Sequence, residues 1–197
     1  MPILHQSDYR RVRWKNDGGW TTQLAACAAS SNDAEVAFDW RISIAEIESD
    51  GAFSRFPGCD RHIALLDGVG MQLSFDHAPD TQLCDRLRFV QFDGEWQTYG
   101  RLLAGPVRDF NVISRRDAIT TQVLHRPLVG AMVFLTEADV TWFVYIANGS
   151  AQLTNADPIQ ELRTGDSLLL DASAIAENTV LSGGGEVVLV KFTRVTH

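Results

Sequence analysis

The stretch Val-Ala-Phe-Asp-Trp-Arg-Ile-Ser-Ile-Ala, residues 36–45, carries a clear alternation of side-chain type. Every even-numbered residue in it is large and apolar, whereas the odd-numbered positions carry small or polar residues that include Arg41 and Ser43. Successive side chains of a β-strand point to opposite faces, so this alternation predicts a strand with one apolar face and one polar face.

Shorter runs rich in β-branched and aromatic residues recur along the chain, and we predict strands there too. The runs are residues 62–66, 71–75, 88–92, 132–135, 140–147, 167–170 and 187–192. Asp67-Gly68, Asp93-Gly94 and Asn148-Gly149 each follow one of them and favour the positive φ of a tight turn, which predicts β-hairpins. Helix signals are weak by comparison. The pattern therefore predicts an all-β chain, built as a sandwich or a barrel.

The size and charge of the chain restrict its partners. Its 197 residues are enough for one large all-β domain or two small ones. A net charge of -8 opposes binding to phosphate backbones, so we expect no nucleic-acid partner. The first thirteen residues lack the apolar run of a signal peptide, and no stretch approaches the roughly 20 apolar residues of a membrane helix. We therefore expect no membrane partner and a cytoplasmic location.

The three cysteines, Cys27, Cys59 and Cys84, are consistent with that location. Their number is odd, and no two of them have the C-x-x-C spacing of a metal site. We expect them to be reduced thiols, as is usual in the cytoplasm.

An internal similarity suggests two copies of one unit. Residues 63–73 and 144–153 each read as an apolar strand, a tight turn and a second strand. After the second copy, Gly165-Asp166 turns the chain into a further apolar strand. We predict a first unit at residues 1–115 and a second at residues 116–197, with strands that can be exchanged between them.

The strand–turn–strand pattern followed by a Gly-Asp turn resembles the cupins, which are small jelly-roll barrels. Longer motifs resemble one branch of them, the HutD/Ves family of bicupins. The motifs are WKNDGGWTTQ at residues 14–23, RISIAE at 41–46, DGAFSRFPGCDR at 50–61 and GPVRDFN at 105–111. The family usually has Gly where Asp17 stands and often has Glu where Gln23 stands.

The resemblance implies a fold and a role. The expected fold is an all-β bicupin, with two jelly-roll (cupin-like) β-barrels in one compact chain. Members of the family are bacterial proteins linked to histidine utilisation, with a proposed regulatory role as binders of a catabolic intermediate. The implied ligand is a small carboxylate metabolite of the glutamate type, for example formylglutamate or formiminoglutamate.

The metal ligands of a typical catalytic cupin are not matched in this chain. Such cupins carry H-x-H-x-x-x-x-E before the first hairpin, where this chain has Ser54, Phe56 and Arg61 at the ligand positions. A phenyl ring cannot coordinate a metal, and Arg61 would bring a permanent positive charge to the ion's place. The histidines are scattered, at positions 5, 62, 77, 125 and 197. We expect no metal and no other cofactor.

An arginine in that position suits a carboxylate, because its parallel N–H groups match the two carboxylate oxygens. Arg61 is therefore a candidate ligand-binding residue, unless it pairs at the surface with Asp60 or Asp50. Arg41 is a second candidate, because a buried arginine must be paired or bind an anion. Its alternative is an exposed strand face shared with Asp39.

Further polar residues could complete the site. Lys15 and Asn16 precede a Gly-Gly pair that would allow close approach of a ligand, or they form an ordinary tight turn. Asp109 and Asn111 share one strand face and could receive an amide or amine group, or they cap a turn. Ser43 shares the strand face of Arg41.

No pattern indicates a catalytic residue. The G-x-S-x-G nucleophile motif is absent, and no carboxylate pair is selected by its spacing. We expect a metal-free binding protein rather than an enzyme. Two alternatives remain at this point. One is a cupin isomerase or hydrolase acting on a small carboxylate, and the other is a structural module that forms a homodimer.

Overall fold

The computed structural model describes residues 3–30, 35–135, 137–154, 159–171 and 178–196. In these ranges the chain forms antiparallel β-sheets, and its one helical element is a 3-10 turn, η1 (Gln6–Asp8). The all-β prediction is confirmed. No helix of the described residues is long and apolar enough to cross a membrane.

The chain divides into two compact units. The N-terminal unit comprises residues 10–119, and the C-terminal unit comprises residues 1–9 and 120–197. The start of the chain belongs to the C-terminal unit because β1 (Ile3–Leu4) pairs with β15 (Ser167–Asp171). The sequence-based division lay between residues 115 and 116 and grouped this first segment with the other unit.

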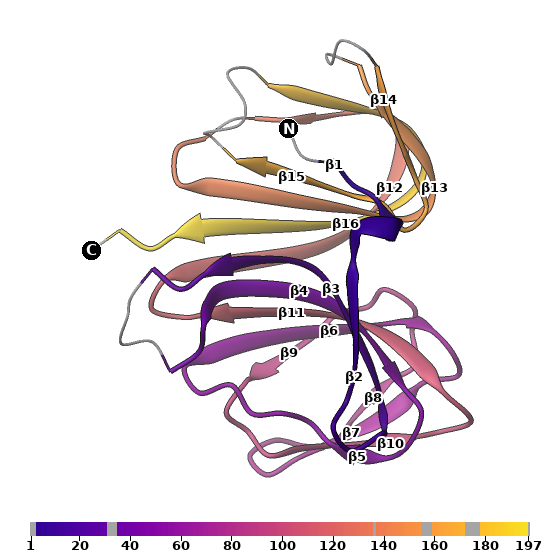
Figure 1. The fold of residues 1–197 in the computed structure, drawn as a ribbon, viewed down its shortest axis with the longest axis vertical. Helices are drawn as coiled ribbons and strands as arrows, with labels where there is room; N and C mark the ends of the chain where they lie inside the picture. The colour runs from indigo at the N-terminus through magenta and orange to yellow at the C-terminus, as the bar shows by residue number, and fades with distance from the viewer. Residues whose placement is uncertain (1–2, 31–34, 136, 155–158, 172–177, 197) are drawn as a thin grey trace. The chain divides into compact units, whose positions relative to one another are not determined.

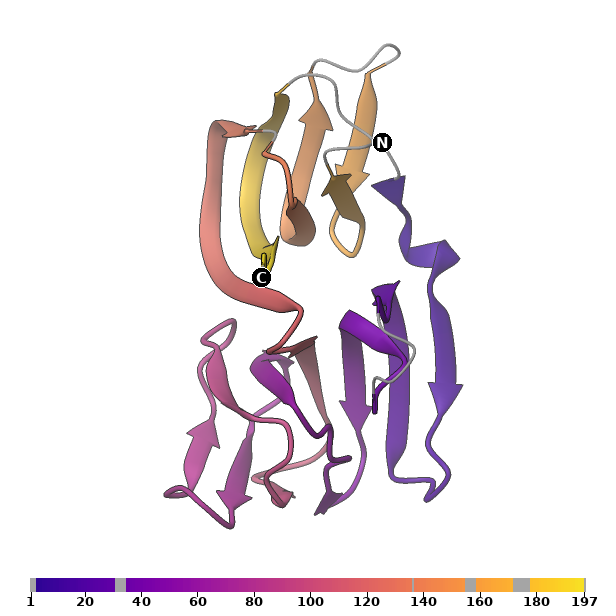
Figure 2. The ribbon, with the colours of Figure 1, turned by 90° about the vertical axis from the view of Figure 1, so that its left-hand side faces the viewer.

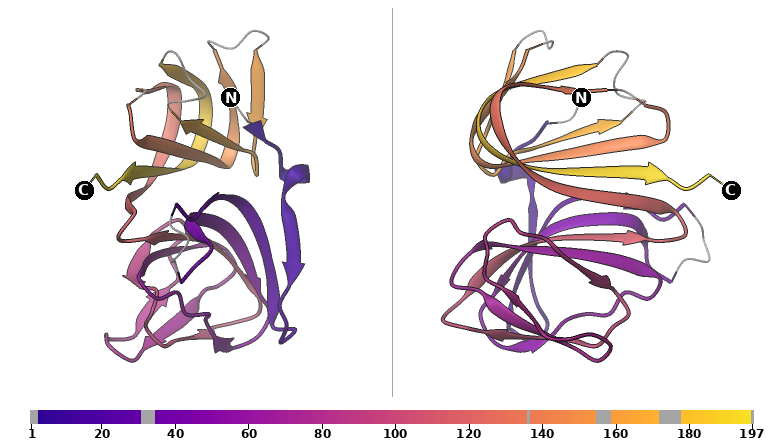
Figure 3. Two further views of the ribbon diagram at one scale, coloured as in Figure 1. Left: turned by 60° about the vertical axis from the view of Figure 1, so that its left-hand side comes forward. Right: turned by 180° about the vertical axis from the view of Figure 1, so that it is seen from behind.

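The N-terminal unit consists of two sheets that face each other (Figures 1 and 3). The larger sheet has the order β2-β3-β4-β11-β6-β9, and the smaller has the order β5-β10-β7-β8. The larger sheet contains β2 (Arg10–Arg13), β3 (Gly19–Ala28), β4 (Phe38–Ile47), β6 (Cys59–Asp67), β9 (Val90–Asp93) and β11 (Val107–Arg115). The smaller contains β5 (Gly51–Ala52), β7 (Met71–Phe75), β8 (Thr81–Leu83) and β10 (Thr98–Leu102).

The C-terminal unit is built on one six-stranded sheet with the order β1-β15-β13-β16-β12, to which β14 adds by pairing with β13. Its remaining strands are β12 (Ile119–Phe134), β13 (Val140–Leu153), β14 (Gln160–Arg163) and β16 (Thr179–Arg194). Figure 2 shows β12 as a long, strongly curved strand. Because of this curvature the sheet wraps around a core of its own.

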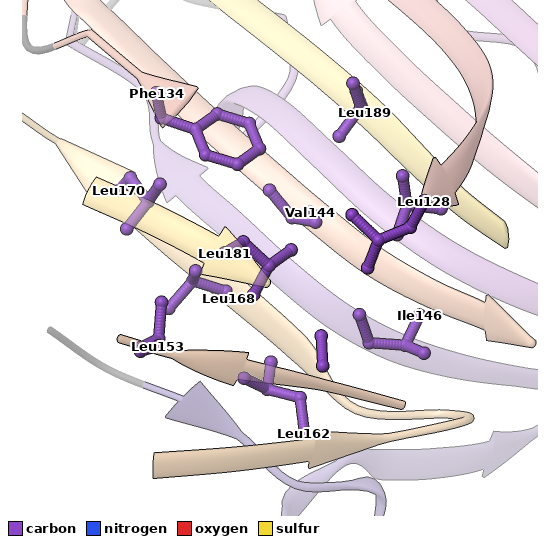
Figure 4. Packing of buried hydrophobic residues seen from close by; sticks show 12 residues of the cluster. Leu128, Phe134, Val144, Ile146, Leu153, Leu162, Leu168, Leu170, Leu181 and Leu189 are labelled. Carbon is purple, nitrogen blue, oxygen red and sulfur yellow. The ribbon is translucent and has the colours of Figure 1, made fainter. Parts of the chain in front are cut away.

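Apolar side chains make up that core. Figure 4 shows leucine, isoleucine, valine and phenylalanine side chains of this core pointing toward one another. Its buried members are Leu128, Phe134, Val144, Ile146, Ala151, Leu153, Leu162, Leu168, Leu170, Leu181, Val187 and Leu189. Packed hydrophobic side chains therefore fill the interior of the C-terminal unit, and the burial of their apolar surface stabilises it.

The strand predicted from residues 36–45 is β4, and it is buried on both faces. Trp40, Ile42 and Ile44 are at most 5% exposed, which confirms that the apolar face is buried. Phe38 is also buried, but it lies beyond a shift in the β3–β4 register and packs with Cys59 and Ile113, on the side of Arg41. The opposite face is buried as well, although it carries polar side chains. It faces the smaller sheet, where Ala45 and Ile47 join a core with Met71, Leu73 and Leu83.

The predicted hairpins are wrong in their pairing. Asp67-Gly68 connects β6 to β7, and Asp93-Gly94 leads from β9 toward β10, but in both cases the two strands belong to different sheets. Asn148-Gly149 lies inside β13, beside a bulge in its pairing with β16. A residue that accepts positive φ serves a chain reversal, a crossing between sheets or a bulge equally well, so the dipeptide alone does not identify a hairpin.

Gly149 should be sensitive to substitution for this reason. It has φ +89°, and a Cβ there would lie 2.1 Å from the carbonyl oxygen of Gly184. We expect Gly149→Ala to lower the free energy of unfolding by about 1–3 kcal/mol or more, measured by urea denaturation. Gly184→Ala is the matched control, because its Cβ would meet no atom within 4 Å. Equal stability of the two variants would contradict this account of the bulge.

Candidate functional site

The register of β11 brings candidate residues from three strands to one face. Ile113 of β11 lies opposite Arg41 of β4 on one side and Arg61 of β6 on the other. Residues directly opposite each other in an antiparallel sheet point to the same side. Both arginines therefore project from the inner face of the larger sheet, the side that faces the smaller sheet.

The next row of the same face adds polar groups. Asn111 lies opposite Ser43 of β4. Asp109 lies two residues before Asn111 on β11 and therefore on the same face. All three side chains are buried. Arg41, Ser43, Arg61, Asp109 and Asn111 thus form one polar cluster on the inner face of the N-terminal unit, which we call the inner-face cluster.

Arg61 is buried and has defined partners. Its Nε and Nη2 donate hydrogen bonds to Asn111 Oδ1 at 3.0 and 2.7 Å. The guanidinium also lies over the rings of Phe53 and Phe92, with its Cζ 4.6 and 5.6 Å from their centroids. Burial lowers the pKa of Arg61 to about 10, while Asp109 opposes that shift. The side chain therefore remains charged at neutral pH.

The alternative partners considered for Arg61 are occupied elsewhere. Asp60 lies beside Arg116, at 3.5 Å, and Asp50 accepts a hydrogen bond from the backbone N–H of Leu102. Arg61 is therefore an inward-facing residue and not half of a surface ion pair.

Asn111 connects Arg61 to a buried acid. Its Nδ2 donates a hydrogen bond to Asp109 Oδ1, while its Oδ1 accepts from Arg61. Asp109 is fully buried, and its Oδ2 has no hydrogen-bond partner among the described residues. Burial raises the pKa of Asp109 to about 7, against the opposite influences of Arg61 and Asn111. This carboxyl group therefore titrates close to neutral pH.

Arg41 lacks a polar partner among the described residues. Its Cζ lies 5.0 Å from the ring centroids of both Phe38 and Phe56, and its buried Nε makes no hydrogen bond within that part of the chain. Burial lowers the pKa of Arg41 from its ordinary value. The alternative partner Asp39 is paired with Arg115 instead, at 3.0 Å. Arg41 is thus a half-buried cation without a counter-ion in the described protein.

Lys15 and Asn16 lie apart from the inner-face cluster. Both are exposed in the turn between β2 and β3, where Asn16 Oδ1 accepts a hydrogen bond from the backbone N–H of Gly18. This turn adjoins the Ile47 end of β4, and at about 3.3 Å per residue Arg41 is about 20 Å further along that strand. The structure brings the other five predicted residues together but not these two.

Other contributors to the site were not singled out from the sequence. They are the rings that stack on the two guanidinium groups, which belong to Phe38, Phe53, Phe56 and Phe92. Phe53 and Phe56 belong to the family motif at residues 50–61, so that motif was the sequence signal that could have identified these two rings.

The described residues contain no group of three or more His, Cys, Asp or Glu side chains arranged to hold a metal ion. His62 neighbours Arg61 on β6 and therefore faces the other side of the sheet. Burial lowers the pKa of His62 to about 4, so this imidazole is neutral at pH 7. His197 lies outside the described residues.

Comparison with known proteins gives the family. The model of the HutD family matches residues 6–189. This chain belongs to the HutD family. An uncharacterized 21.2 kDa protein in the hutC 3′ region of Pseudomonas putida is 42% identical over 113 residues. Those residues are 57% of this HutD-family chain and 57% of the relative, so the match spans less than two thirds of that protein's length.

Two further comparisons agree with this assignment. Protein Ves of Escherichia fergusonii is 30% identical over 145 residues, which are 71% of this chain and 69% of Ves. The structure of HutD from Pseudomonas fluorescens SBW25 (formate condition) matches with a TM-score of 0.83 and 29% identity, over 99% of both chains. The predicted HutD/Ves resemblance and the cupin-like jelly-roll fold are confirmed. The sheet orders nevertheless leave edge strands, so the units are open jelly rolls and not closed barrels.

The titration of Asp109 should appear in the stability of the protein. Its folded-state pKa of about 7 lies above the value of about 3.9 for an unfolded aspartate. The folded state therefore holds the proton more tightly, and this contribution is full below pH 4 and is lost as pH rises to about 7.

We therefore expect the stability of the parent, relative to Asp109→Asn, to fall by up to about 4 kcal/mol between pH 4 and pH 8. Urea denaturation of both proteins across this range measures the difference. Asp85→Asn, at an exposed site on the surface, is the control and should follow the parent at every pH. A constant difference between the parent and Asp109→Asn would contradict the buried, titrating carboxyl group.

Proposed function

We propose that this protein binds a small glutamate-like dicarboxylate, such as formylglutamate or formiminoglutamate, at the inner-face cluster without using a metal. The proposed role is regulatory, in cytoplasmic histidine utilisation. The observation that carries the proposal is Arg41, a half-buried guanidinium with no polar partner among the described residues. Burying an unpaired cation is costly, so such a group is best explained by an anion that it receives.

Arg61 supplies a second cation on the same face. Asn111 occupies its Nε and Nη2, and no described residue accepts a hydrogen bond from its Nη1. Because both arginines lie opposite Ile113, they flank one position of β11 from its two sides. A ligand with two carboxylates can place one on each guanidinium, which favours a dicarboxylate over a simple anion.

The setting of the two guanidinium groups strengthens their effect. Each is stacked on two phenyl rings, which exclude water and limit the side chain's freedom. A charge pair is worth more where water is excluded, and less entropy is lost on binding when a side chain is already ordered.

The link to histidine utilisation rests on the family. The chain belongs to the HutD family, and a Pseudomonas putida relative is described by its place in the hutC 3′ region. The three cysteines, all in described positions, form no disulfide, in keeping with a cytoplasmic location.

An enzymatic role is the second candidate, because Asp109 is a buried carboxyl group whose pKa of about 7 suits general acid–base chemistry. The protein would then be an isomerase or hydrolase of a small carboxylate. Proton NMR of N-formylglutamate incubated with stoichiometric protein separates the two candidates. A binding protein leaves the spectrum of the compound unchanged over hours, whereas an enzyme produces new resonances.

Removing either arginine should weaken binding of N-formylglutamate by about 1.5–3 kcal/mol, which is about one to two decades in dissociation constant. Titration calorimetry of Arg41→Ala and Arg61→Ala measures this, with folding checked by circular dichroism. Arg13→Ala is the control, because Arg13 pairs with Glu48 on the outside. Arg61→Lys keeps the charge but cannot hold Asn111 with two N–H groups while a third faces the ligand, so it should bind nearly as poorly as Arg61→Ala. Folded alanine variants that bind like the parent would refute the site.

Binding should not depend on a metal. We expect the same dissociation constant for N-formylglutamate before and after dialysis against a chelator, and less than one transition-metal ion per chain by elemental analysis. Loss of binding on chelation, restored by a divalent metal, would overturn the metal-free proposal.

A further inference from the structure

Asn111 and Asp109 were candidate ligand contacts, but the polar atoms of Asn111 are already committed within the protein. Its Oδ1 accepts both hydrogen bonds from Arg61, and its Nδ2 donates to Asp109. Both residues are at most 2% exposed. The chain of contacts Arg61–Asn111–Asp109 therefore runs from the guanidinium into the protein and not toward a ligand.

We propose that Asp109 and Asn111 are positioning residues that act through Arg61, and that Asp109 takes up a proton when an anion binds to Arg61. This inference rests on the proposed function. It adds that ligand binding at Arg61 changes the protonation of Asp109, a residue that the ligand does not touch.

The surroundings of Asp109 leave few charges that could control it. Toward β6 it faces Leu65 and Arg61, and toward β4 it faces Ala45, with Arg41 further along that strand. The buried residues of the smaller sheet carry no charge: they are apolar, apart from Thr98 of β10 and Gly100. Asp39 and Arg115 lie toward the far ends of β4 and β11, where they pair with each other. Among the described residues, Arg61 is thus the cation that acts on Asp109.

The coupling follows from charge balance. In the empty site, Arg61 is the cation that favours the ionised form of Asp109. A bound carboxylate neutralises Arg61 and adds a negative charge nearby, so the ionised form of Asp109 loses its counter-ion. One proton then moves from solvent to the Asp109 carboxyl group. The ligand carboxylate at Arg61 thereby replaces the negative charge that Asp109 loses, so the net charge beside Arg61 is unchanged. The pKa of Asp109, about 7 without ligand, puts this event in the neutral range.

The sign of the pH dependence is fixed by linkage. Below pH 6 Asp109 is protonated in both states, and affinity is highest. Above pH 7 the proton must be taken up on binding, so affinity falls by up to about tenfold per pH unit. The carboxylates of N-formylglutamate stay ionised throughout this range, since carboxyl groups ordinarily titrate near pH 4.

The test is calorimetric titration of N-formylglutamate at pH 6, 7 and 8, in pairs of buffers with different ionisation enthalpies. For the parent we expect a dissociation constant that rises at least fivefold from pH 6 to pH 8, and uptake of up to one proton per ligand at pH 8. Asp109→Asn imitates the protonated acid. It should bind like the parent at pH 6, more tightly than the parent at pH 8, and without proton uptake. Asp60→Asn, at the neighbour of Arg61 that faces away, should keep the parent's pH dependence.

Two results would overturn the inference. One is a parent dissociation constant that does not change between pH 6 and pH 8, with no proton taken up. The other is an Asp109→Asn variant that folds but binds equally poorly at all three pH values, because a lost ligand contact behaves in that way. If Asp109→Asn does not fold, the proton uptake of the parent decides alone.

Failure of the proposed function is recognised separately. If N-formylglutamate does not bind at any pH, the ligand proposal fails, and carbon-13 NMR titration of the ligand-free protein then tests the coupling of Asp109 to Arg61 through Asn111. An Asp109 that titrates near pH 7, and whose pKa rises in Asn111→Ala, supports this coupling. An Asp109 that titrates below pH 5 refutes it.

Discussion

The pairing of β11 with β4 on one side and β6 on the other is the constraint on which the N-terminal unit depends. It places Ile113 between Arg41 and Arg61, and it places Asn111 beside Ser43. A shift of one residue in the β4 pairing would bring Ile42 and Ile44 inward and turn Arg41 outward, and the same shift in the β6 pairing would turn Arg61 outward. The apolar requirement of the other face therefore fixes the position of the polar cluster.

Both units are built of antiparallel sheets, but the residues of their interiors differ. In the C-terminal unit, strands β12 to β16 fill the interior with leucine, valine and isoleucine side chains. In the N-terminal unit the inner face is apolar toward Ile47 and Val107 but carries buried charge toward Arg41 and Arg61. Buried charge contributes little to stability by itself, and the proposed recognition of a carboxylate would account for its presence in an otherwise packed interior.

The alternation at residues 36–45 was sufficient to predict β4 and the shared face of Arg41 and Ser43. The pairing of strands was not predictable in the same way, because positive-φ dipeptides mark crossings and bulges as well as hairpins, as Gly149 shows. The strand β3 was missed because its sequence, GWTTQLAACA, alternates only weakly. For the site, the residue types predicted Arg41 and Arg61, but the separation of Lys15 from them depends on register, which no local pattern encodes.

The central claim is that the inner-face cluster receives a carboxylate from each end of one ligand. A crystal structure of the protein grown with saturating N-formylglutamate tests it most directly. The account predicts ligand density on the inner face of the larger sheet, with one carboxylate within hydrogen-bond distance of the Arg41 guanidinium and the other at Arg61 Nη1. Density at another place, or an inner face with Arg41 unchanged and no ligand beside it, would contradict the account.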